Sequence, residues 1–305
     1  MGMLDSKVAV VTGAGRGLGR EEIIDLAAHG ARVVINEVNR PDAKAAAHET
    51  AELITNAGGE AIVVLGDCAD SNDAEALMAT TLDTYGDLNI MVNNAGFLRD
   101  KTIFGMSDDE FDSVVRVHLR GHFVNMRNAT QHWRNRAKSG EQTYGRLLST
   151  SSEAVLYGSA GQPNYAAAKA GIIAMTLGAA QLMGRYGVTC NTIMPRAETD
   201  MTNSGPTAAM FAAPESGFHH FDPANVAPLV SYLASPDAAH ISGEVFVVWG
   251  NQVNVLQRPT VLPAHVNPDG EQKWTPQGLH ASLSSHFDAN YRSVYDGFAL
   301  PIDQG

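Results

Sequence analysis

Cysteine and positive charge are both scarce in this chain of 305 residues. There are two cysteines, Cys68 and Cys190, so a fold stapled by several disulfides is excluded and a reducing, cytoplasmic location is expected. Lys and Arg together number 21 against 33 Asp and Glu, which gives a net charge of −12. Nucleic-acid binding needs a basic face, and this balance argues against one. We therefore expect no nucleic-acid partner.

Long apolar runs and clustered metal ligands are also missing. No apolar run approaches the roughly 20 residues that cross a bilayer, and the first residues lack the basic-then-apolar pattern of a secretory signal. We therefore expect no membrane partner. His219 and His220 are adjacent, but no cysteine or third ligand accompanies them at a recognisable spacing. The sequence accordingly predicts no metal site.

Short runs of valine and isoleucine alternate with longer amphipathic stretches over most of the chain. Continuous apolar runs are typical of strands buried on both faces. Strand–helix alternation predicts an α/β fold of the Rossmann type, with a doubly wound parallel sheet in three αβα layers. Seven strands are expected, at 7–12, 32–36, 61–65, 89–92, 145–150, 188–194 and 244–248. The long stretch 107–136 is expected to be one helix.

The pattern also suggests how the chain is divided. Residues 1–250 are expected to form a dinucleotide-binding catalytic domain, in which about 200–222 read as a loop or a mobile helical lid over the substrate. Five of the 13 prolines follow Gly250, and the strand–helix rhythm stops there. We interpret 251–305 as a C-terminal extension that packs on the domain or on a neighbouring subunit.

The first strand runs directly into a glycine-rich turn, Thr12-Gly13-Ala14-Gly15-Arg16-Gly17-Leu18-Gly19. Glycine lets the backbone turn tightly and approach a pyrophosphate, which the N-terminus of the next helix favours. A lone glycine triplet is weak, but here it has a strand before it, a helix after it and an acid, Glu37, at the end of the second strand. We therefore expect a dinucleotide on this turn, contacted by Gly13, Arg16, Gly17, Leu18 and Gly19.

The choice between NAD and NADP rests on opposing charges. The Glu37 carboxylate suits the ribose hydroxyls and repels a 2′-phosphate, whereas Arg16 inside the turn and Arg40 after the second strand favour that phosphate. We weigh Glu37 more heavily, because its position fits the ribose directly, and predict NAD, with NADP as the less favoured alternative. Asp67 either accepts a hydrogen bond from the adenine amino group or is simply an acidic residue near the N-terminus of the next helix. Cys68 beside it is expected to pack at the adenine.

Tyr165 and Lys169 lie four residues apart, on one face of an expected helix. Tyrosine is a poor base at its ordinary pKa near 10, but a neighbouring ammonium favours the phenolate and eases proton exchange with an alcohol. Ser152 ends the fifth strand and offers a hydroxyl to a substrate oxygen. Such a pair is frequent by chance, and its position in a nucleotide-binding fold gives it meaning.

Together these motifs, with Asn93-Asn94-Ala95-Gly96 after the fourth strand, resemble the short-chain dehydrogenase/reductase family over residues 5–250. The resemblance implies strand order 3-2-1-4-5-6-7, a homodimer or homotetramer, and hydride transfer between a nicotinamide and a carbinol carbon. It implies that Tyr165 is the general acid/base, that Ser152 orients the substrate oxygen and that Lys169 holds the nicotinamide ribose. It further implies sheet or cofactor roles for Asn93, Ala95, Gly96, Pro195 and Thr199.

Two positions depart from the family's pattern. His118 stands where the family has an asparagine that holds a water in a proton relay; histidine can do the same or be a buried packing residue. Its stretch, His118-Leu119-Arg120-Gly121, is similar to the (3R)-hydroxyacyl-CoA dehydrogenase part of peroxisomal multifunctional enzymes. Arg196 replaces the glycine that follows Pro195, and is expected to meet an acidic group of the substrate.

The sequence thus predicts an oxidoreductase that transfers hydride between NAD and a small secondary alcohol or ketone. The resemblance favours a 3-hydroxyacyl thioester or a hydroxysteroid. An NADPH-dependent 3-oxoacyl reductase is the alternative within this class, supported by Arg16. A non-catalytic dinucleotide-binding sensor is the alternative of another class. Because a sensor need not retain Ser152, Tyr165 and Lys169, their presence argues against it.

Overall fold

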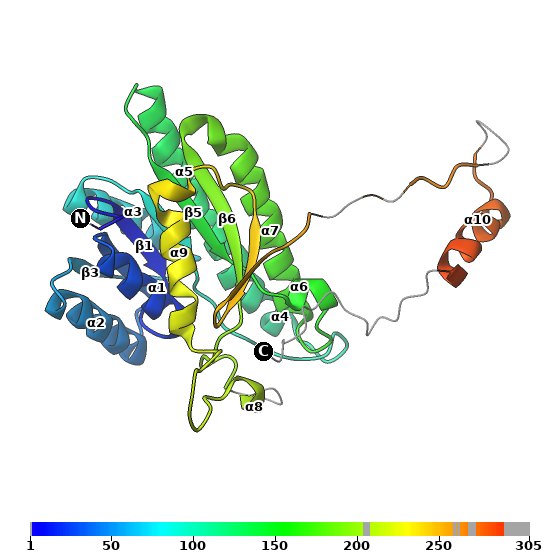
Figure 1. Cartoon of the computed structure of the whole chain (residues 1–305), viewed down its shortest axis with the longest axis horizontal. Coiled ribbons are helices and arrows are strands. Elements are labelled where there is room, and N and C mark those ends of the chain that lie inside the picture. Colours follow the sequence, from blue (N-terminus) through cyan, green and yellow to red (C-terminus); the bar gives the residue numbers. More distant parts are fainter. Residues whose placement is uncertain (1, 204–207, 259–260, 262, 268–272, 290–305) are drawn as a thin grey trace. The chain divides into compact units, whose positions relative to one another are not determined.

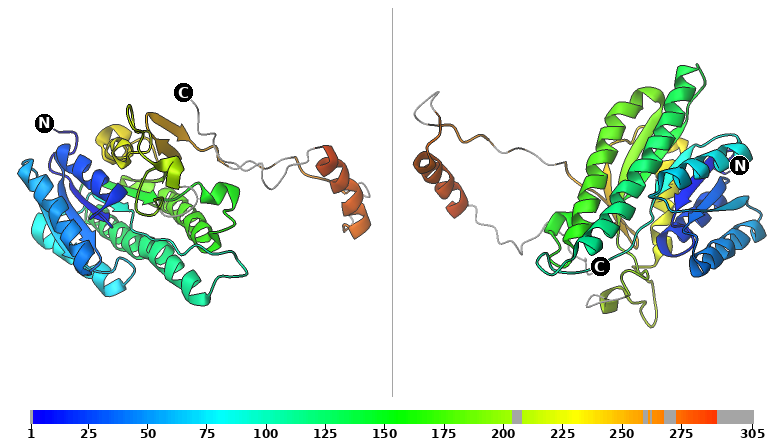
Figure 2. Two further views of the ribbon diagram at one scale, coloured as in Figure 1. Left: turned by 90° about the horizontal axis from the view of Figure 1, so that it is seen from below. Right: turned by 180° about the vertical axis from the view of Figure 1, so that it is seen from behind.

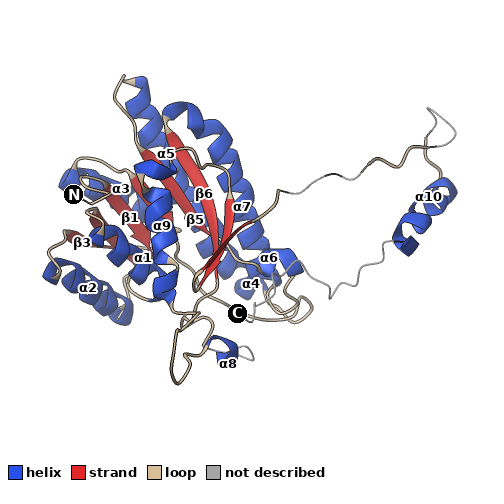
Figure 3. Cartoon of the chain, viewed as in Figure 1, coloured by secondary structure: helices blue, strands red, loops and turns tan. Residues whose placement is uncertain are grey.

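The computed structural model describes residues 2–203, 208–258, 261, 263–267 and 273–289. The chain divides into two compact units, Met1–Leu256 and Gln257–Gly305. The first unit holds one sheet with helices on both faces, as Figures 1 and 3 show. In the second unit, the described part contains helix α10 (Pro276–Ala289) and a hydrogen bond of 2.9 Å between His265 Nδ1 and Ser282 Oγ.

The sheet has the order β3-β2-β1-β4-β5-β6-β7-β8, and every pairing except β7–β8 is parallel. The predicted Rossmann-type order is therefore confirmed. The strands are β1 (Val8–Thr12), β2 (Arg32–Glu37), β3 (Ala61–Leu65), β4 (Ile90–Asn93), β5 (Gly145–Thr150), β6 (Val188–Pro195), β7 (Val245–Trp249) and β8 (Gln252–Val255).

The eighth strand corrects the prediction of seven. β8 pairs antiparallel with β7, with Phe246 opposite Val255, and the first unit extends to Leu256 instead of ending at residue 250. Along β8 the side chains alternate between half-buried and exposed. A short edge strand with this alternation lacks the continuous apolar run by which the inner strands were recognised, so the sequence reasoning passed over it.

Two helical layers cover the sheet (Figure 2). Alternate residues of β1 separate the two cores: Ala9 and Val11 pack with α1, α2 and α9, whereas Val10 packs with α3, α5 and α7. This alternation is what a strand buried on both faces requires. The longer helices of this unit are α1 (Gly17–Ala28), α2 (Pro41–Asn56), α3 (Ser71–Tyr85), α4 (Asp108–Val115), α5 (Gly121–Lys138), α7 (Pro163–Met183) and α9 (Ala227–Ala234).

The stretch expected as one helix over 107–136 is interrupted. A capping box at Ser107 and Glu110 starts α4, and a π-helical turn, η1 (Arg116–Arg120), then joins α4 to α5. A π turn inserts an extra residue into the helical repeat and changes which side chains face inward; such turns are frequent at functional sites. His118 lies within this turn and is fully buried.

One helix contradicts the expectation that no segment is apolar enough to cross a membrane. The stretch Pro163–Tyr186, which is α7 with the short turn that follows, has a mean hydropathy of 1.3 and reaches the necessary length. It is rich in alanine rather than in a continuous run of large apolar residues, so the sequence reasoning did not recognise it. In the structure α7 packs along β6 and β5, and 33% of this apolar stretch is buried.

Burial against the sheet predicts a measurable loss for a central-strand substitution. Leu148 on β5 is 1% exposed, whereas Leu182 on α7 is 53% exposed. Leu148→Ala is expected to lower the free energy of unfolding by about 2–5 kcal/mol. The substitution removes buried apolar atoms and leaves a cavity in their place. Leu182→Ala, the same chemical change, is expected to cost less than about 1 kcal/mol. Denaturant titration measures both; equal losses would contradict the assigned core.

Candidate active site

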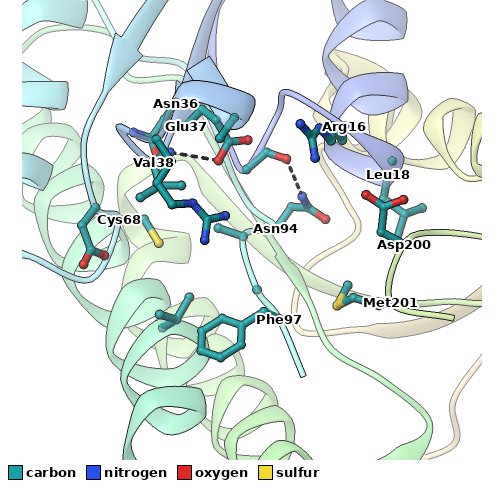
Figure 4. Close-up of a pocket in the computed structure, with 18 of the residues that line it drawn as sticks. Arg16, Leu18, Asn36, Glu37, Val38, Cys68, Asn94, Phe97, Asp200 and Met201 are labelled. Atoms are coloured by element: carbon teal, nitrogen blue, oxygen red, sulfur yellow. Dashed lines mark hydrogen bonds between the residues drawn. The ribbon is translucent and has the colours of Figure 1, made fainter. Parts of the chain in front are cut away.

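A cavity of about 440 Å³ opens where the first strands of the sheet end. Figure 4 shows Arg16, Glu37, Cys68, Asn94 and Asp200 around it. This is the carboxyl-end crevice at which doubly wound sheets bind ligands. Of the residues predicted to contact the cofactor, the cavity wall includes Gly13, Arg16, Gly17, Leu18, Glu37, Asp67, Cys68, Ala95, Gly96 and Thr199.

The glycines of the turn are required by the close approach of neighbouring backbone. Gly13 and Gly17 have φ of 67° and 53°, in the left-handed region that favours glycine. A Cβ on Gly13 would lie 2.9 Å from Ala95 Cα, and one on Gly19 would lie 2.4 Å from the Gly13 carbonyl oxygen. Gly19 therefore supports the turn from behind and does not line the cavity. The glycine-rich turn Gly13–Gly19 thus forms an open cradle at the N-terminus of α1, and this cradle fits the pyrophosphate of a nicotinamide dinucleotide.

Two charged groups predicted to decide between NAD and NADP are already hydrogen-bonded. The Glu37 carboxylate accepts the backbone N–H of Gly15 at 3.2 Å and that of Val38 at 2.9 Å. Arg16 donates to the Asp42 carbonyl oxygen at 2.9 Å and pairs with the Asp42 carboxylate at 3.5 Å. Glu37 is thereby held at the cavity wall, while Arg16 has an acidic partner of its own.

The wall after β3 contains an ion pair that the sequence reasoning missed. The Asp67 carboxylate pairs with Arg116 at 2.7 Å and accepts the backbone N–H of Ala69 at 2.8 Å. Burial, followed by the nearby Asp67 carboxylate, raises the pKa of the Cys68 thiol to about 12. Cys68 is therefore an unreactive packing residue at the predicted adenine site. Arg116 lies on the π turn η1, which no residue pattern indicated.

Asn94, and not Asn93, ties the cofactor turn to β4. The backbone N–H of Asn94 donates to Thr12 Oγ1 at 3.0 Å, and its Nδ2 donates to the Thr12 carbonyl oxygen at 3.2 Å. Asn93 is buried, does not line the cavity, and has no hydrogen-bond partner for its side chain among the described residues. The resemblance assigned the sheet role to Asn93, which stays a prediction; the structure adds Asn94 as the residue whose hydrogen bonds join β4 to the glycine-rich turn.

Tyr165 and Lys169 are positioned by the first turns of α7. Pro163 occupies the start of this helix, a position that proline favours, and the Lys169 ammonium lies 5.4 Å from the centroid of the Tyr165 ring. Lys169 is 2% exposed and donates to the Thr150 carbonyl oxygen, at the end of β5, at 2.6 Å. Burial lowers the pKa of Lys169 to about 7, and the Glu22 carboxylate opposes that shift.

His118 packs edge-on against Tyr165, with ring centroids 5.1 Å apart and an interplanar angle of 85°. Its Nε2 lies 2.8 Å from the Phe97 carbonyl oxygen, and a Cβ on Gly96 would overlap the imidazole ring. Burial, followed by the Lys169 charge, holds the pKa of His118 well below its ordinary range. The ring is therefore neutral and in place beside Tyr165; its part in proton transfer stays a prediction.

Glu22 on α1 is a buried acid that the sequence reasoning missed. It is fully buried, and neither carboxyl oxygen has a hydrogen-bond partner among the described residues. Burial raises the pKa of Glu22 to about 8, and the Lys169 charge opposes the rise. An acidic residue in a helix normally indicates a solvated face, so its place in the α1 sequence gave no signal.

The remaining predicted residues lie outside the cavity wall. Pro195 ends β6 without lining the cavity, and Arg196 is paired with Glu153 instead of facing an open pocket. In the predicted lid, His219 lies 3.2 Å from the Glu198 carboxylate; residues 204–207 of the lid fall outside the described residues. Among those described, no group of three or more His, Cys, Asp or Glu side chains is arranged to hold a metal.

The buried Glu22 carboxyl predicts a pH dependence of stability. A raised pKa in the folded state means that the fold binds this proton more tightly than the unfolded chain does, so stability falls as pH rises from about 4.5 toward 8. Glu22→Gln removes that loss, and its stability relative to the parent is expected to rise by roughly 2–4 kcal/mol between pH 5 and 8. Denaturant titrations of the parent and the variant at pH 5 and pH 8 measure this difference, with the exposed Glu52→Gln as control. The same pH dependence of stability in Glu22→Gln and the parent would refute the prediction.

Comparisons with known proteins show which family this chain resembles. The family model described as short chain dehydrogenase matches residues 7–208. A hydroxyacyl-CoA dehydrogenase of Mycobacterium tuberculosis is 47% identical over 291 residues, covering 93% of this chain and 89% of that protein. The peroxisomal multifunctional enzyme type 2 of Mus musculus is 36% identical over 281 residues, covering 90% of this chain and 36% of that longer protein.

A solved structure extends the agreement to the fold. The crystal structure of a short chain dehydrogenase from Mycobacterium avium superposes with a TM-score of 0.84 at 38% identity, and all of both chains is covered. The resemblance to the dehydrogenase part of the multifunctional enzymes is confirmed as well. With the family model matching most of the catalytic unit, the chain belongs to the short-chain dehydrogenase/reductase family and is an NAD(P)-dependent oxidoreductase.

Proposed function

We propose that this enzyme oxidises the hydroxyl group of a 3-hydroxyacyl thioester with NAD. The observation that carries the proposal is the Tyr165–Lys169 pair, held beside the dinucleotide cradle by the hydrogen bond from Lys169 to the carbonyl oxygen of Thr150. The choice of substrate is supported by the similarity to a protein named hydroxyacyl-CoA dehydrogenase, which covers 93% of this chain. A hydroxysteroid is the second substrate class to be tested.

In this mechanism Tyr165 accepts the proton of the substrate hydroxyl as the alcohol becomes a ketone, and returns it in the reverse direction. The charged form of Lys169 stabilises the phenolate. Ser152 donates its hydroxyl to the substrate oxygen and holds it within reach of Tyr165. When bound, the nicotinamide supplies the hydride chemistry; the protein contributes orientation and charge.

We assign to His118, as a neutral imidazole, the place in the proton relay that an asparagine occupies in the family. A pKa held well below the ordinary range keeps the imidazole uncharged at neutral pH, so it exchanges a proton only in concert with a partner. Its contact with the Tyr165 ring, at 5.1 Å between centroids, places it next to the phenol. We therefore assign His118 to orienting Tyr165 and the proton path behind it, and not to carrying a positive charge.

NAD is the proposed cofactor because of how Glu37 and Arg16 are held. Two backbone N–H groups fix the Glu37 carboxylate at the cavity wall, where a 2′-phosphate meets negative charge. Of the two arginines that favour NADP, Arg16 is paired with Asp42, whereas Arg40 lines the cavity. An NADPH-dependent 3-oxoacyl reductase is the candidate that this arrangement disfavours.

We also propose a cytoplasmic enzyme that acts as a homodimer or homotetramer. Both cysteines, Cys68 and Cys190, are free and buried, which suits a reducing compartment. The oligomeric state follows from the resemblance to the family.

Replacing the phenol tests the mechanism directly. Tyr165→Phe keeps the ring against His118 and removes the acid/base, so turnover is expected to fall by about 10²–10⁴-fold. Cofactor affinity, measured by quenching of protein fluorescence, is expected to stay unchanged, because the ring does not line the cradle. Steady-state rates with 3-hydroxyacyl-CoA, hydroxysteroid and small-alcohol substrates give the comparison. Wild-type turnover in Tyr165→Phe on every substrate would sink the assignment.

Neutralising the acid at the ribose end tests the cofactor choice. Glu37→Gln keeps an oxygen for the Gly15 N–H and removes the charge that a 2′-phosphate would meet. The ratio of kcat/KM for NAD over NADP is expected to fall about tenfold or more, which corresponds to about 1.4 kcal/mol. Exposed Glu52→Gln is the control. A parent enzyme that already prefers NADP shows that Glu37 does not select the cofactor.

A further inference from the structure

A buried ion pair lies next to Ser152 in the chain, outside the residues that line the cavity. Arg196 Nε donates to Glu153 Oε2 at 2.5 Å, and Arg196 Nη2 donates to Glu153 Oε1 at 2.9 Å. Both side chains are only 9% exposed. The guanidinium carbon also lies 4.2 Å from the centroid of the Trp249 ring. One bidentate pair and one cation–π contact thus join the segments at the ends of β5, β6 and β7.

Ser152 itself has little local support. It lies between β5 and the short helix α6 (Ala154–Tyr157), outside any regular element. Among the described residues, its hydroxyl accepts one hydrogen bond, from the backbone N–H of Ala154 at 3.2 Å. The orientation of the hydroxyl therefore depends on how the residues on either side are held.

Those two neighbours are anchored to different elements. On one side, Ser151 Oγ donates to the carbonyl oxygen of Lys169 on α7 at 2.9 Å, and the Ser151 N–H donates to the Ile193 carbonyl oxygen on β6 at 2.7 Å. On the other side, Glu153 is held by Arg196. Ser152 is thus bracketed between the helix that carries the acid/base and the strand end that carries Arg196.

We propose that the Glu153–Arg196 pair is a positioning clamp that fixes the Ser152 hydroxyl relative to Tyr165. This inference rests on the proposed function, because it assigns Ser152 its task toward the substrate oxygen. Neither Glu153 nor Arg196 is a catalytic residue in this account; both act through Ser152. A displacement of about 1 Å at a positioned group costs about a hundredfold in rate, so loss of the clamp reduces turnover more than substrate binding.

Stability alone does not account for this pair. Replacing a buried ion pair by apolar residues of similar volume is often neutral or stabilising, whereas removing one partner leaves an uncompensated charge. The pair also corrects the expectation for Arg196: its guanidinium is matched by Glu153 and does not offer its full charge to an acidic substrate group.

The test measures coupling to Ser152. Arg196→Met, made in the parent, is expected to lower kcat about 10–100-fold with little change in substrate KM. Made in a Ser152→Ala background, the same change is expected to lower kcat less than about twofold, because the group it positions is already gone. Equal losses in the two backgrounds overturn the clamp. Wild-type turnover in Ser152→Ala would instead remove the proposed role of Ser152, which is a different result.

A double replacement separates positioning from folding. Glu153→Leu combined with Arg196→Met leaves no unpaired charge, and is expected to recover the parent's Tm while kcat stays at least about tenfold down. Recovery of both Tm and kcat overturns the proposal, and this variant also decides the question if Arg196→Met alone does not fold. Asp87→Asn, which breaks the remote ion pair between Asp87 and Arg136, is the control: it is expected to lower Tm and leave kcat unchanged.

Discussion

The hydrogen bond from the buried Lys169 ammonium to the Thr150 carbonyl oxygen sets the geometry of the active site. A buried lysine loses its hydration, which is unfavourable. A hydrogen bond of 2.6 Å to the carbonyl oxygen of Thr150, the last residue of β5, compensates for part of that loss. The contact fixes the start of α7 against the sheet and thereby fixes Tyr165, one helical turn earlier. Burial lowers the pKa of this ammonium to about 7, and the nearby Glu22 carboxylate opposes that shift.

The cofactor end depends on a different constraint, the close approach of backbone to backbone. Gly13 and Gly19 admit contacts that any Cβ would block, and the Asn94 hydrogen bonds draw the end of β4 against the same turn. The glycine-rich turn is therefore held in shape by contacts within the protein itself. This turn and a lysine anchored to β5 place the two halves of the reaction on neighbouring strand ends, which is how a doubly wound sheet concentrates a site at one edge.

Sequence reasoning recovered the parts of this architecture that rest on local pattern. The apolar strands, the glycine turn, Glu37 and the Tyr165–Lys169 spacing all follow from chain periodicity or from close sequence neighbours. The parts it missed depend on contacts between distant segments. Glu153 and Arg196 are 43 residues apart, and the Asp67–Arg116 pair joins a loop to a π turn with no sequence pattern of its own. Edge strand β8 was missed for the opposite reason, since half of its side chains are exposed and too polar for a core strand.

Glu22, His118, Lys169 and the Glu153–Arg196 pair share one property: each places an ionisable group where water is excluded. Such groups raise the energetic cost of folding, and apolar residues of similar size would stabilise the core better. Around the Ser152 hydroxyl and the Tyr165 phenol, however, these ionisable groups sit in a medium of low dielectric constant. Electrostatic interactions are stronger there than in water. The buried ionisable groups near Tyr165 and Ser152 are therefore better explained by the reaction than by the fold.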